Sequence, residues 1–455
     1  MAPERERVFI VGTGCTAFTK PRGERQTSEM GLEAATKALL DAGITYDVIE
    51  AAFVGYVYGA STCGQSALYQ LGLTGIPITN VNNNCATGSV ALFHAATLVR
   101  AGEARCALAL GFERMAPGAL GDPWLDRPSP IRPLLDAAAR AAPDVDLGAP
   151  PMPRVFGAAA AEYFRLHGGG VECLAKIAAK NHRHALHNPY AQFREGYSET
   201  EILTSKPITN ELTKFMCSPT SDGAACCVVA NEAFVRAHKL ENQAIELVAI
   251  GLATDFPEAF AGRSVMDSVG YGMTRRLADK VFAWAGANRD DVGVIELHDC
   301  FAANELITYS AVGLCAIEDT HNFIERGDNS YGGKYVINPS GGLEAKGHPL
   351  GATGLAMHFS ITMQLRNWAG PMQAPGLFDT QDARGKYGLV HNIGLGGAAV
   401  ISLLRRPEFY RAGGQDGRDR LGYNHAHELR LITSADVDNA KSKAYSENLL
   451  RLAKL

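Results

Sequence analysis

Stretches typical of strands alternate along this chain with stretches typical of helices, and this alternation constrains the fold more than any other feature. A helical pattern runs from Ser28 to Leu40 and stops at Gly43, between the first two strand-like runs. Short apolar runs predict four early strands, at 8–11, 52–57, 78–81 and 106–110. Because βαβ units build parallel sheets covered by helices, the chain is predicted to be α/β.

The later part of the chain repeats this arrangement weakly. An Ala-Gly pair followed by Asp-Val and a strand occurs at 42–48 and again at 285–292. Further strand-like runs follow at 294–297, 388–390 and 398–404. Two related halves that face each other would place a functional site between them.

The composition changes between the two halves and again after the second. Nine of the 21 prolines fall between Pro117 and Pro153, ahead of a helical stretch, which predicts an inserted excursion rather than more sheet. After Arg406 the residues are polar and charged through to Leu455, and we expect this tail to be loosely attached. The predicted domains are a first half of residues 1–118 and 213–245, an inserted loop domain of 119–212, a second half of 246–406 and a polar tail of 407–455.

Composition excludes several classes of function. The 455 residues are 46% hydrophobic, enough for a sizeable core, and the net charge of -5 gives no attraction to nucleic acid. No run approaches the roughly 18 consecutive apolar residues that a membrane span needs. Ten cysteines without a C-x-x-C pair, and no secretory signal before the first strand, predict a reducing compartment and argue against structural zinc.

Four glycine- or asparagine-framed segments carry the reactive side chains, at 82–88, 298–301, 346–351 and 391–397. In the first segment Cys85 joins a strand to a helix whose first turn is small residues. Unpaired N–H groups and the helix dipole would lower the pKa of its thiol and make it a nucleophile. A buried structural cysteine is the competing interpretation.

The segment around His348 favours the interpretation of Cys85 as a nucleophile over that of a structural cysteine. Gly347-His348-Pro349 predicts proline at the first helical position and histidine at the cap, where the dipole keeps the imidazole neutral. Such a base could take the Cys85 proton and later polarise a thioester carbonyl. The alternative is a capping histidine that binds nothing.

His298 and Cys300 follow a strand end, where α/β sheets place their chemistry. Cys300 could donate and accept a proton, and His298 could donate to an oxyanion. Metal binding by this pair lacks evident third and fourth ligands. The backbone N–H of Gly394 could pair with that of Cys85 as a second oxyanion hole, although this glycine turn is also typical of a tight connection.

Together these segments resemble the four active-site motifs of the thiolase superfamily, specifically of its sterol-carrier-protein type, over about residues 5 to 405. The resemblance implies the thiolase fold, with two similar βαβαβαββ halves, a five-layered αβαβα core and a loop domain inserted in the first half. It also implies a homodimer or a tetramer, coenzyme A as co-substrate, and no bound metal or redox cofactor.

The resemblance also implies a role for each residue. Cys85 would be the acylated nucleophile, His348 its activator and Cys300 the acid and base. His298 with His348 would form one oxyanion hole, and the N–H groups of Cys85 and Gly394 the other.

The chain departs from ordinary thiolases at two motifs, with Asn392 in place of a catalytic cysteine and His298-Asp299 in place of Asn-Glu. Both departures agree with the sterol-carrier-protein subgroup. Members of the two-domain type continue into a lipid-binding domain of more than a hundred residues, whereas about fifty follow Arg406 here, so lipid transfer is not implied.

The expected activity is therefore that of a 3-oxoacyl-CoA thiolase, with Claisen condensation as its reverse. A thiolase-fold enzyme that only condenses and a non-catalytic acyl-CoA-binding protein are the rivals. Arg183, Lys214 and Arg263 are candidate coenzyme A contacts, or equally solvated surface charge. The terminal Ala453-Lys454-Leu455 resembles a peroxisomal address, or arises by chance, and a mitochondrial location remains the alternative.

Overall fold

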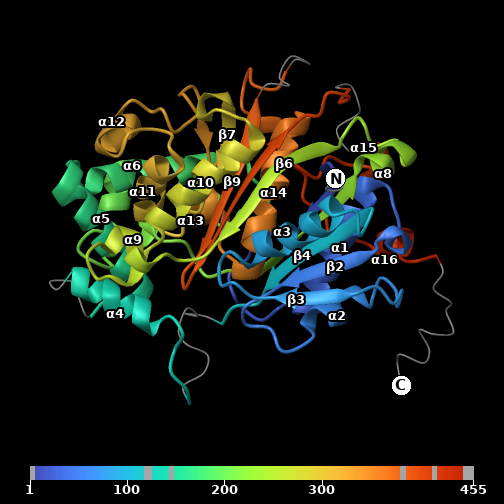
Figure 1. Ribbon diagram of the computed structural model, residues 1–455, viewed down its shortest axis with the longest axis horizontal. Helices are drawn as coiled ribbons and strands as arrows, with labels where there is room; N and C mark the ends of the chain where they lie inside the picture. The colour runs from blue at the N-terminus through green and yellow to red at the C-terminus, as the bar shows by residue number, and fades with distance from the viewer. Residues whose placement is uncertain (1–5, 117–125, 143–147, 380–385, 412–417, 444–455) are drawn as a thin grey trace, which may run out of the picture.

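The chain folds as two halves that repeat the same order of elements. This computed structural model describes residues 6–116, 126–142, 148–379, 386–411 and 418–443 (Figure 1). The first half contains β1 (Val8–Cys15), α1 (Thr27–Ala42), β2 (Ala51–Gly55), α2 (Cys63–Leu68), β3 (Ile78–Val81), α3 (Thr87–Arg100), β4 (Cys106–Glu113) and β5 (Gly223–Asn231). The second contains β6 (Ile245–Ala253), α10 (Tyr271–Ala285), β7 (Val292–Glu296), α11 (Ala302–Val312), β8 (Val336–Ile337), α14 (Leu350–Arg366), β9 (Tyr387–Gly394) and β10 (Ala398–Arg405). The predicted α/β class and βαβαβαββ order are confirmed.

The sheet order shows the same repeat. Strands of the first half lie in the order β3-β2-β4-β5-β1, and those of the second in the matching order β8-β7-β9-β10-β6. In each half the first three of these strands are parallel and the last two pair antiparallel. The halves join where β1 pairs with β6 through Phe9 with Glu246 and Ile10 with Ile245.

Helices separate and cover the two halves of this sheet. Helices α3 and α14 pack against each other between the halves, whereas α1 with α2 covers the outer face of the first half and α10 with α11 that of the second. This gives the predicted αβαβα layers. The start of α1 is held by a capping box of Gln26 and Glu29, and the helix ends at Gly43 in the left-handed conformation that glycine favours.

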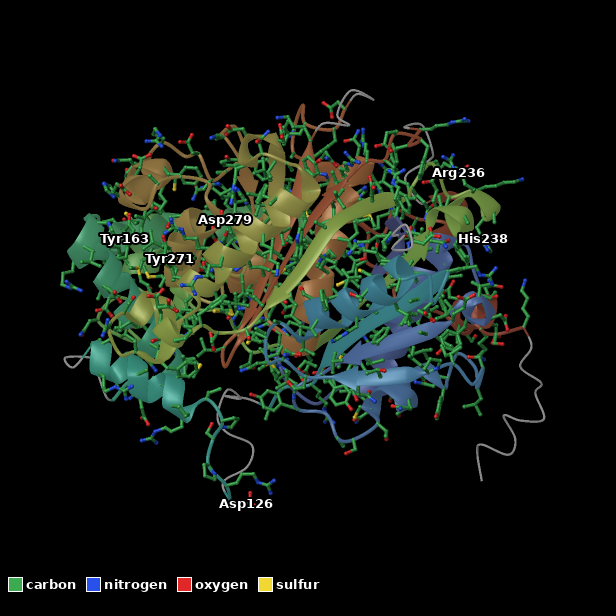
Figure 2. The ribbon with its side chains drawn as sticks, in the orientation of Figure 1. Asp126, Tyr163, Arg236, His238, Tyr271 and Asp279 are labelled. Carbon is green, nitrogen blue, oxygen red and sulfur yellow. The ribbon has the colours of Figure 1, made fainter. Side chains whose placement is uncertain are left out.

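The described residues between β4 and β5 of the first half form four α-helices, and the first three of these pack on the second half. They are α4 (Arg132–Ala141), α5 (Pro151–His167), α6 (Val171–His184) and α7 (Glu199–Leu203). Helices α5 and α6 contact α11, and α4 and α5 contact α9 (Val265–Ser268). Tyr163 of α5 lies on the same side of the molecule as Tyr271 of α10, and its hydroxyl donates to the Ile317 carbonyl at 3.1 Å (Figure 2). The limits 119–212 of a loop domain stay a prediction.

The expectation of a loosely attached tail is wrong for residues 407–411 and 418–443. His425 and Ala440 are fully buried, and the Tyr190 hydroxyl donates to the His425 carbonyl at 2.5 Å. Helices α15 (Arg418–Leu421) and α16 (Ser434–Ala440) pack on α1. The tail is attached by a few buried side chains spaced among charged ones, a pattern that average composition hides. Its last residues, including Ala453-Lys454-Leu455, lie outside the described part.

The remaining helices are α8 (Glu232–Ala237), α12 (Thr320–Glu325) and α13 (Gly342–Lys346). Among the described residues, no helix combines the length and apolar character that crossing a bilayer demands.

Candidate active site

One cavity of about 530 Å³ is lined by all five candidate site residues from the sequence. These are Cys85, His298, Cys300, His348 and Gly394. They come from both halves. The segments that carry them precede α3, α11 and α14 or end β9, so the cavity lies where the two halves meet. The structure therefore brings together residues that are up to 309 positions apart in the chain.

The turn before α3 is built by asparagines and a threonine. Asn84 adopts a positive φ of 52°. Thr87 Oγ1 accepts from the Asn83 N–H at 2.8 Å and donates to the Asn84 carbonyl at 2.5 Å. The Cys85 thiol points to Asn84 Oδ1 at 3.7 Å. Thr87, the first residue of α3, thus fastens the turn that presents the sulfur.

The protonation of Cys85 differs from the expectation. Burial raises the pKa of its thiol to about 12, and the nearby Glu113 charge adds to the rise. The expected lowering by the helix start is therefore wrong, because loss of solvent outweighs the dipole at this position. With this pKa the Cys85 thiol is protonated at neutral pH.

His348 is held in one tautomer. Its Nδ1 lies 2.8 Å from Thr353 Oγ1, whose hydroxyl donates to the Pro349 carbonyl at 3.0 Å. The threonine oxygen must therefore accept from an Nδ1–H, which leaves Nε2 as a bare acceptor. Nε2 is buried and has no hydrogen-bond partner among the described residues. Burial lowers the pKa of His348 to about 3, so the ring is a neutral base.

The start of α14 also differs slightly from the expectation. Pro349 is the N-cap, with φ of -72° and ψ of 107°, and the helix begins at Leu350. His348 thus lies one residue before the cap, and Ser221 Oγ accepts from its backbone N–H at 3.0 Å. The histidine is placed by this contact with the segment before β5 as much as by the helix.

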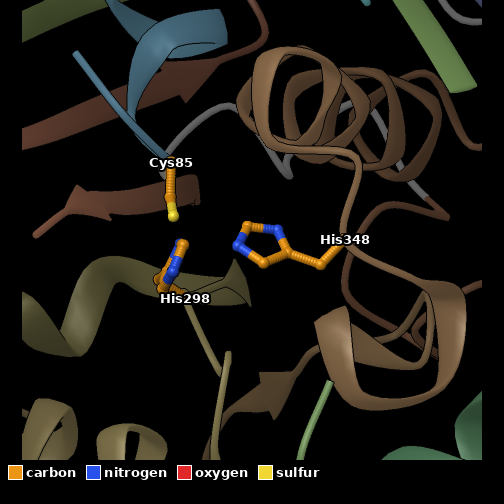
Figure 3. Close-up of side chains that lie close together, drawn as sticks. All are labelled: Cys85, His298 and His348. Atoms are coloured by element: carbon orange, nitrogen blue, oxygen red, sulfur yellow. The ribbon is translucent and has the colours of Figure 1, made fainter. Parts of the chain in front are cut away.

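His298 and His348 converge on Cys85 (Figure 3). One nitrogen of each ring and the Cys85 sulfur all lie within 4.8 Å of one another. The ring centroids are 5.1 Å apart and the rings are nearly perpendicular, at 81°. By spacing alone the three atoms would suit a metal ion. However, Asn392 Nδ2 donates to His298 Nδ1 at 2.8 Å, which puts the proton on Nε2 and removes one of the three lone pairs.

Cys300 faces the same cavity while its neighbour turns away. Cys300 is 8% exposed, and its carbonyl accepts from the Ser218 N–H at 2.9 Å. Burial, followed by the proximity of Cys85, raises the pKa of the Cys300 thiol. Asp299 instead accepts from the Leu343 N–H at 2.7 Å and from Asn181. It therefore anchors α13, just ahead of the His348 segment.

Gly394 lies where only glycine fits. A Cβ at this position would stand 2.1 Å from the Asn83 carbonyl oxygen and 3.0 Å from the Ala86 nitrogen. The end of β9 therefore runs directly against the turn that carries Cys85. Asn84 Nδ2 also donates to the Leu395 carbonyl at 3.0 Å, which ties the two segments together.

Apolar side chains that no motif indicated form another part of the wall. Phe156 of α5 stacks on Phe301 with ring centroids 4.8 Å apart, and Met152 and Ile131 line the same space. These contacts join residues from distant segments, so local patterns could not reveal them. The motifs also assigned no role to Thr353 or Asn392. In the structure these two residues are hydrogen-bonded to the rings of His348 and His298, respectively. The candidate coenzyme A contacts Arg183, Lys214 and Arg263 are exposed and do not line this cavity.

Comparison with known proteins gives a consistent result. Residues 8–206 match the family model of the thiolase N-terminal domain, and residues 262–404 match that of the thiolase C-terminal domain-like family. The chain is 50% identical over 408 residues to sterol carrier protein 2 of Rattus norvegicus, covering 89% of this chain and 73% of that protein. It is 44% identical over 411 residues to non-specific lipid-transfer protein-like 2 of Caenorhabditis elegans, covering 89% and 97%.

Solved structures agree on the fold. A structure described as an Ltp2-ChsH2(DUF35) aldolase matches with a TM-score of 0.70 at 21% identity, over 89% of this chain and 98% of that one. At this identity the likeness concerns the arrangement of helices and strands alone.

Proposed function

Because this chain belongs to the thiolase family, in its sterol-carrier-protein type, and is an acyltransferase, we propose that it is a 3-oxoacyl-CoA thiolase acting through an acyl-enzyme at Cys85. The observation that carries this proposal is the bare Nε2 of His348, a buried acceptor in the group of three that includes the Cys85 sulfur. A neutral thiol with a pKa of about 12 needs such a base within the same cavity.

In the first half-reaction, Cys85 attacks the 3-keto carbon of the substrate while its proton moves to His348 Nε2. The N–H groups of Cys85 and Gly394 donate to the oxyanion that forms. The bond between C2 and C3 then breaks, and its electron pair forms an enolate whose thioester oxygen accepts from His298. Cys300 gives its proton to C2, and acetyl-CoA leaves, or propanoyl-CoA from a 2-methyl substrate.

In the second half-reaction, the Cys300 thiolate takes the proton of coenzyme A, whose sulfur attacks the acyl group on Cys85. The shortened acyl-CoA leaves, and His348 returns its proton to the Cys85 sulfur. Both cysteines and His348 finish as they began, so the scheme uses coenzyme A and no other co-substrate. Run backwards, it is a Claisen condensation.

The apolar wall of Met152, Phe156 and Phe301 supports an acyl chain as the cargo of this cavity. We assign the role of coenzyme A holder to the inserted region at 119–212, since α5 supplies part of this wall. A thiolysis panel of straight-chain, 2-methyl-branched and steroid-side-chain 3-oxoacyl-CoAs would place the reaction in fatty acid or in branched and sterol side-chain metabolism.

Acylation tests the proposal directly. The protein is incubated with acetyl-CoA and its intact mass is measured, with Cys85→Ala as the control. We expect the wild-type chain to gain one acetyl group and the variant to gain none. An unmodified wild-type chain would support the rival view of a non-catalytic acyl-CoA-binding protein.

Cys300 separates a thiolase from an enzyme that only condenses. We expect Cys300→Ala to lose both thiolysis of acetoacetyl-CoA and condensation. Cys85 is still acetylated in this variant, at a lower rate, because coenzyme A can leave as a thiolate without the proton that Cys300 supplies. Condensation at the wild-type rate in this variant would favour the condensing enzyme.

The same proposal includes assembly and location. Strand β3 lies at the edge of the sheet and pairs only with β2 among the described strands, which leaves its outer side for a second copy of the chain. Light scattering on the purified protein would show a homodimer, or a tetramer.

A peroxisomal location, with the mitochondrion as the alternative, is tested by imaging a fluorescent fusion with and without Ala453-Lys454-Leu455.

A further inference from the structure

Asn392 contacts both reactive segments without lining the cavity. It lies in β9 and is fully buried. Its amide nitrogen donates to His298 Nδ1 at 2.8 Å and to the Cys85 carbonyl at 3.2 Å. One side chain of the second half therefore holds an imidazole and the backbone of the nucleophile at the same time.

These two contacts fix the orientation of the amide and hence the tautomer of His298. A carbonyl oxygen can only accept, so the group facing the Cys85 carbonyl must be the NH₂ and not the amide oxygen. The same nitrogen faces His298 Nδ1, which must then be the acceptor. The single proton of a neutral imidazole is consequently on Nε2, the nitrogen available to the cavity.

The two histidines of the site thus carry opposite tautomers. Thr353 leaves His348 with a bare Nε2, whereas Asn392 leaves His298 with an Nε2–H. A proton acceptor and a proton donor face one substrate position, as removal of a thiol proton and stabilisation of an enolate oxygen require.

We propose that Asn392 is the positioning residue that makes His298 an oxyanion donor, by holding it in the Nε2–H tautomer. This inference rests on the proposed thiolase function. Asn392 occupies the position at which ordinary thiolases carry a catalytic cysteine, so in this chain that position has passed from proton transfer to control of a tautomer.

The substitution Asn392→Asp leaves the shape of the side chain almost unchanged but replaces a hydrogen-bond donor to His298 Nδ1 with an acceptor. A carboxylate accepts from Nδ1–H, so the neutral ring would present a bare Nε2 to the enolate oxygen. A neighbouring carboxylate also favours the imidazolium, in which both nitrogens carry protons. The titratable groups that face this ring are His348, His391, Cys85 and Cys300, from the segments before α14, α3 and α11 and from β9.

Two reactions with acetyl-CoA distinguish positioning from folding. Acetylation of Cys85, followed by intact mass, does not need His298, because the N–H groups of Cys85 and Gly394 hold its oxyanion. Exchange of the acetyl-CoA methyl hydrogens with deuterated water does need His298, because it proceeds through the enolate. We expect Asn392→Asp to keep acetylation and to lose exchange by about 10²–10³-fold at alkaline pH. Exchange should recover as the pH falls to mildly acidic values and the imidazolium forms.

Controls make the result decisive. Asn392→Ala removes the donor without supplying a carboxylate, so its loss of exchange should not recover at lower pH. Asn424→Asp places the same change at a buried asparagine of the tail, which donates to the Trp368 carbonyl at 2.9 Å, and should keep the wild-type ratio of exchange to acetylation. Equal loss of both reactions without pH recovery, or exchange at the wild-type rate, in Asn392→Asp overturns the proposal.

The tautomer of His298 can also be measured directly in the wild-type chain. Nitrogen NMR of the ¹⁵N-histidine-labelled protein, with the His298 signals assigned by their absence in His298→Asn, reports which ring nitrogen is protonated. We expect a protonated Nε2 and a bare Nδ1, and the opposite pattern refutes the inference. A wild-type chain that is not acetylated at Cys85 would instead refute the thiolase function and leave the tautomer result standing.

Discussion

At the scale of single residues, the geometry of the site depends on hydroxyl and amide groups that do not line its cavity, those of Thr353 and Asn392. Thr353 Oγ1 accepts a hydrogen bond from His348 Nδ1–H, and its hydroxyl donates to the Pro349 carbonyl. Without this acceptor the imidazole can rotate or change tautomer, and its Nε2 no longer points a lone pair at the Cys85 thiol.

Thr353→Val should therefore lower kcat for thiolysis by about 10–100-fold, because it removes the hydrogen bond that orients the histidine we propose as the base. Thr362→Val is the matched control, because Thr362 is also fully buried on α14 and its hydroxyl has no partner among the described residues. Steady-state thiolysis of acetoacetyl-CoA checks both variants. Equal activity of the two would show that the His348 tautomer is not held by Thr353.

At the scale of elements, Glu113 at the end of β4 fastens three chain segments around the site. Its carboxylate accepts from the N–H groups of Val57 and Tyr58, which follow β2, and of Gly351 in the first turn of α14, each at 3.0 Å. Burial raises the pKa of Glu113 from 4.5 to about 7, and the three N–H donors offset only part of this rise.

This shift makes stability depend on pH in a defined window. Between pH 4.5 and about 7 the folded chain keeps a proton on Glu113 that the unfolded chain loses, so stability from this group is lost as pH rises through the window. The loss approaches about 3 kcal/mol. Urea unfolding at several pH values should show a shallower pH dependence for Glu113→Gln. Glu50→Gln, which breaks the exposed pair with Arg105, should keep the wild-type slope, and identical slopes in all three proteins would contradict this role.

The sequence predicted those helices and strands whose limits depend on neighbouring residues in the chain. Gly43 ends α1 because glycine adopts the left-handed conformation there, and an uninterrupted apolar run marks β4. Strand β8 has only two residues, too few for any periodicity, and was not predicted. The motifs brought Cys85 and the two histidines into view, but the contact of His298 with Asn392 spans 94 residues and depends on the folded sheet.

The error on the Cys85 pKa has the same origin. A helix start can be predicted from neighbouring residues, whereas burial depends on what the other half of the molecule places over the thiol. The same limit applies to Phe156, whose partner Phe301 comes from a segment 145 positions away.

At the scale of the whole molecule, the described tail belongs to the folded body. The Ser442 N–H donates to the Leu71 carbonyl at 2.9 Å, and the Tyr190 hydroxyl donates to the His425 carbonyl. Ending the chain at Arg406 should lower the urea midpoint of unfolding, because apolar surface on α1 and around Tyr190 is uncovered. A chain that ends at Lys443 keeps these contacts and serves as the control. Equal midpoints for the two truncated chains would show that the tail adds no stability.

A buried ion pair joins the two halves. Arg366 at the end of α14 lies 2.8 Å from the Asp41 carboxylate of α1, which also accepts from the Thr13 N–H at 2.8 Å, and both charged side chains are fully buried. Removing one partner leaves the other charge unpaired in a low dielectric, which costs about 3–5 kcal/mol. Asp41→Asn should lower the free energy of unfolding by this amount.

The comparison for Asp41→Asn is again Glu50→Gln, whose exposed pair should contribute under about 1 kcal/mol. Urea unfolding followed by circular dichroism measures both. Because the cavity is built from segments of both halves, thiolysis by Asp41→Asn should disappear at the same urea concentration as the circular dichroism signal. Loss of activity well before unfolding would instead mean that the halves separate as independent units, and that the pair holds the site together without setting the stability of either half.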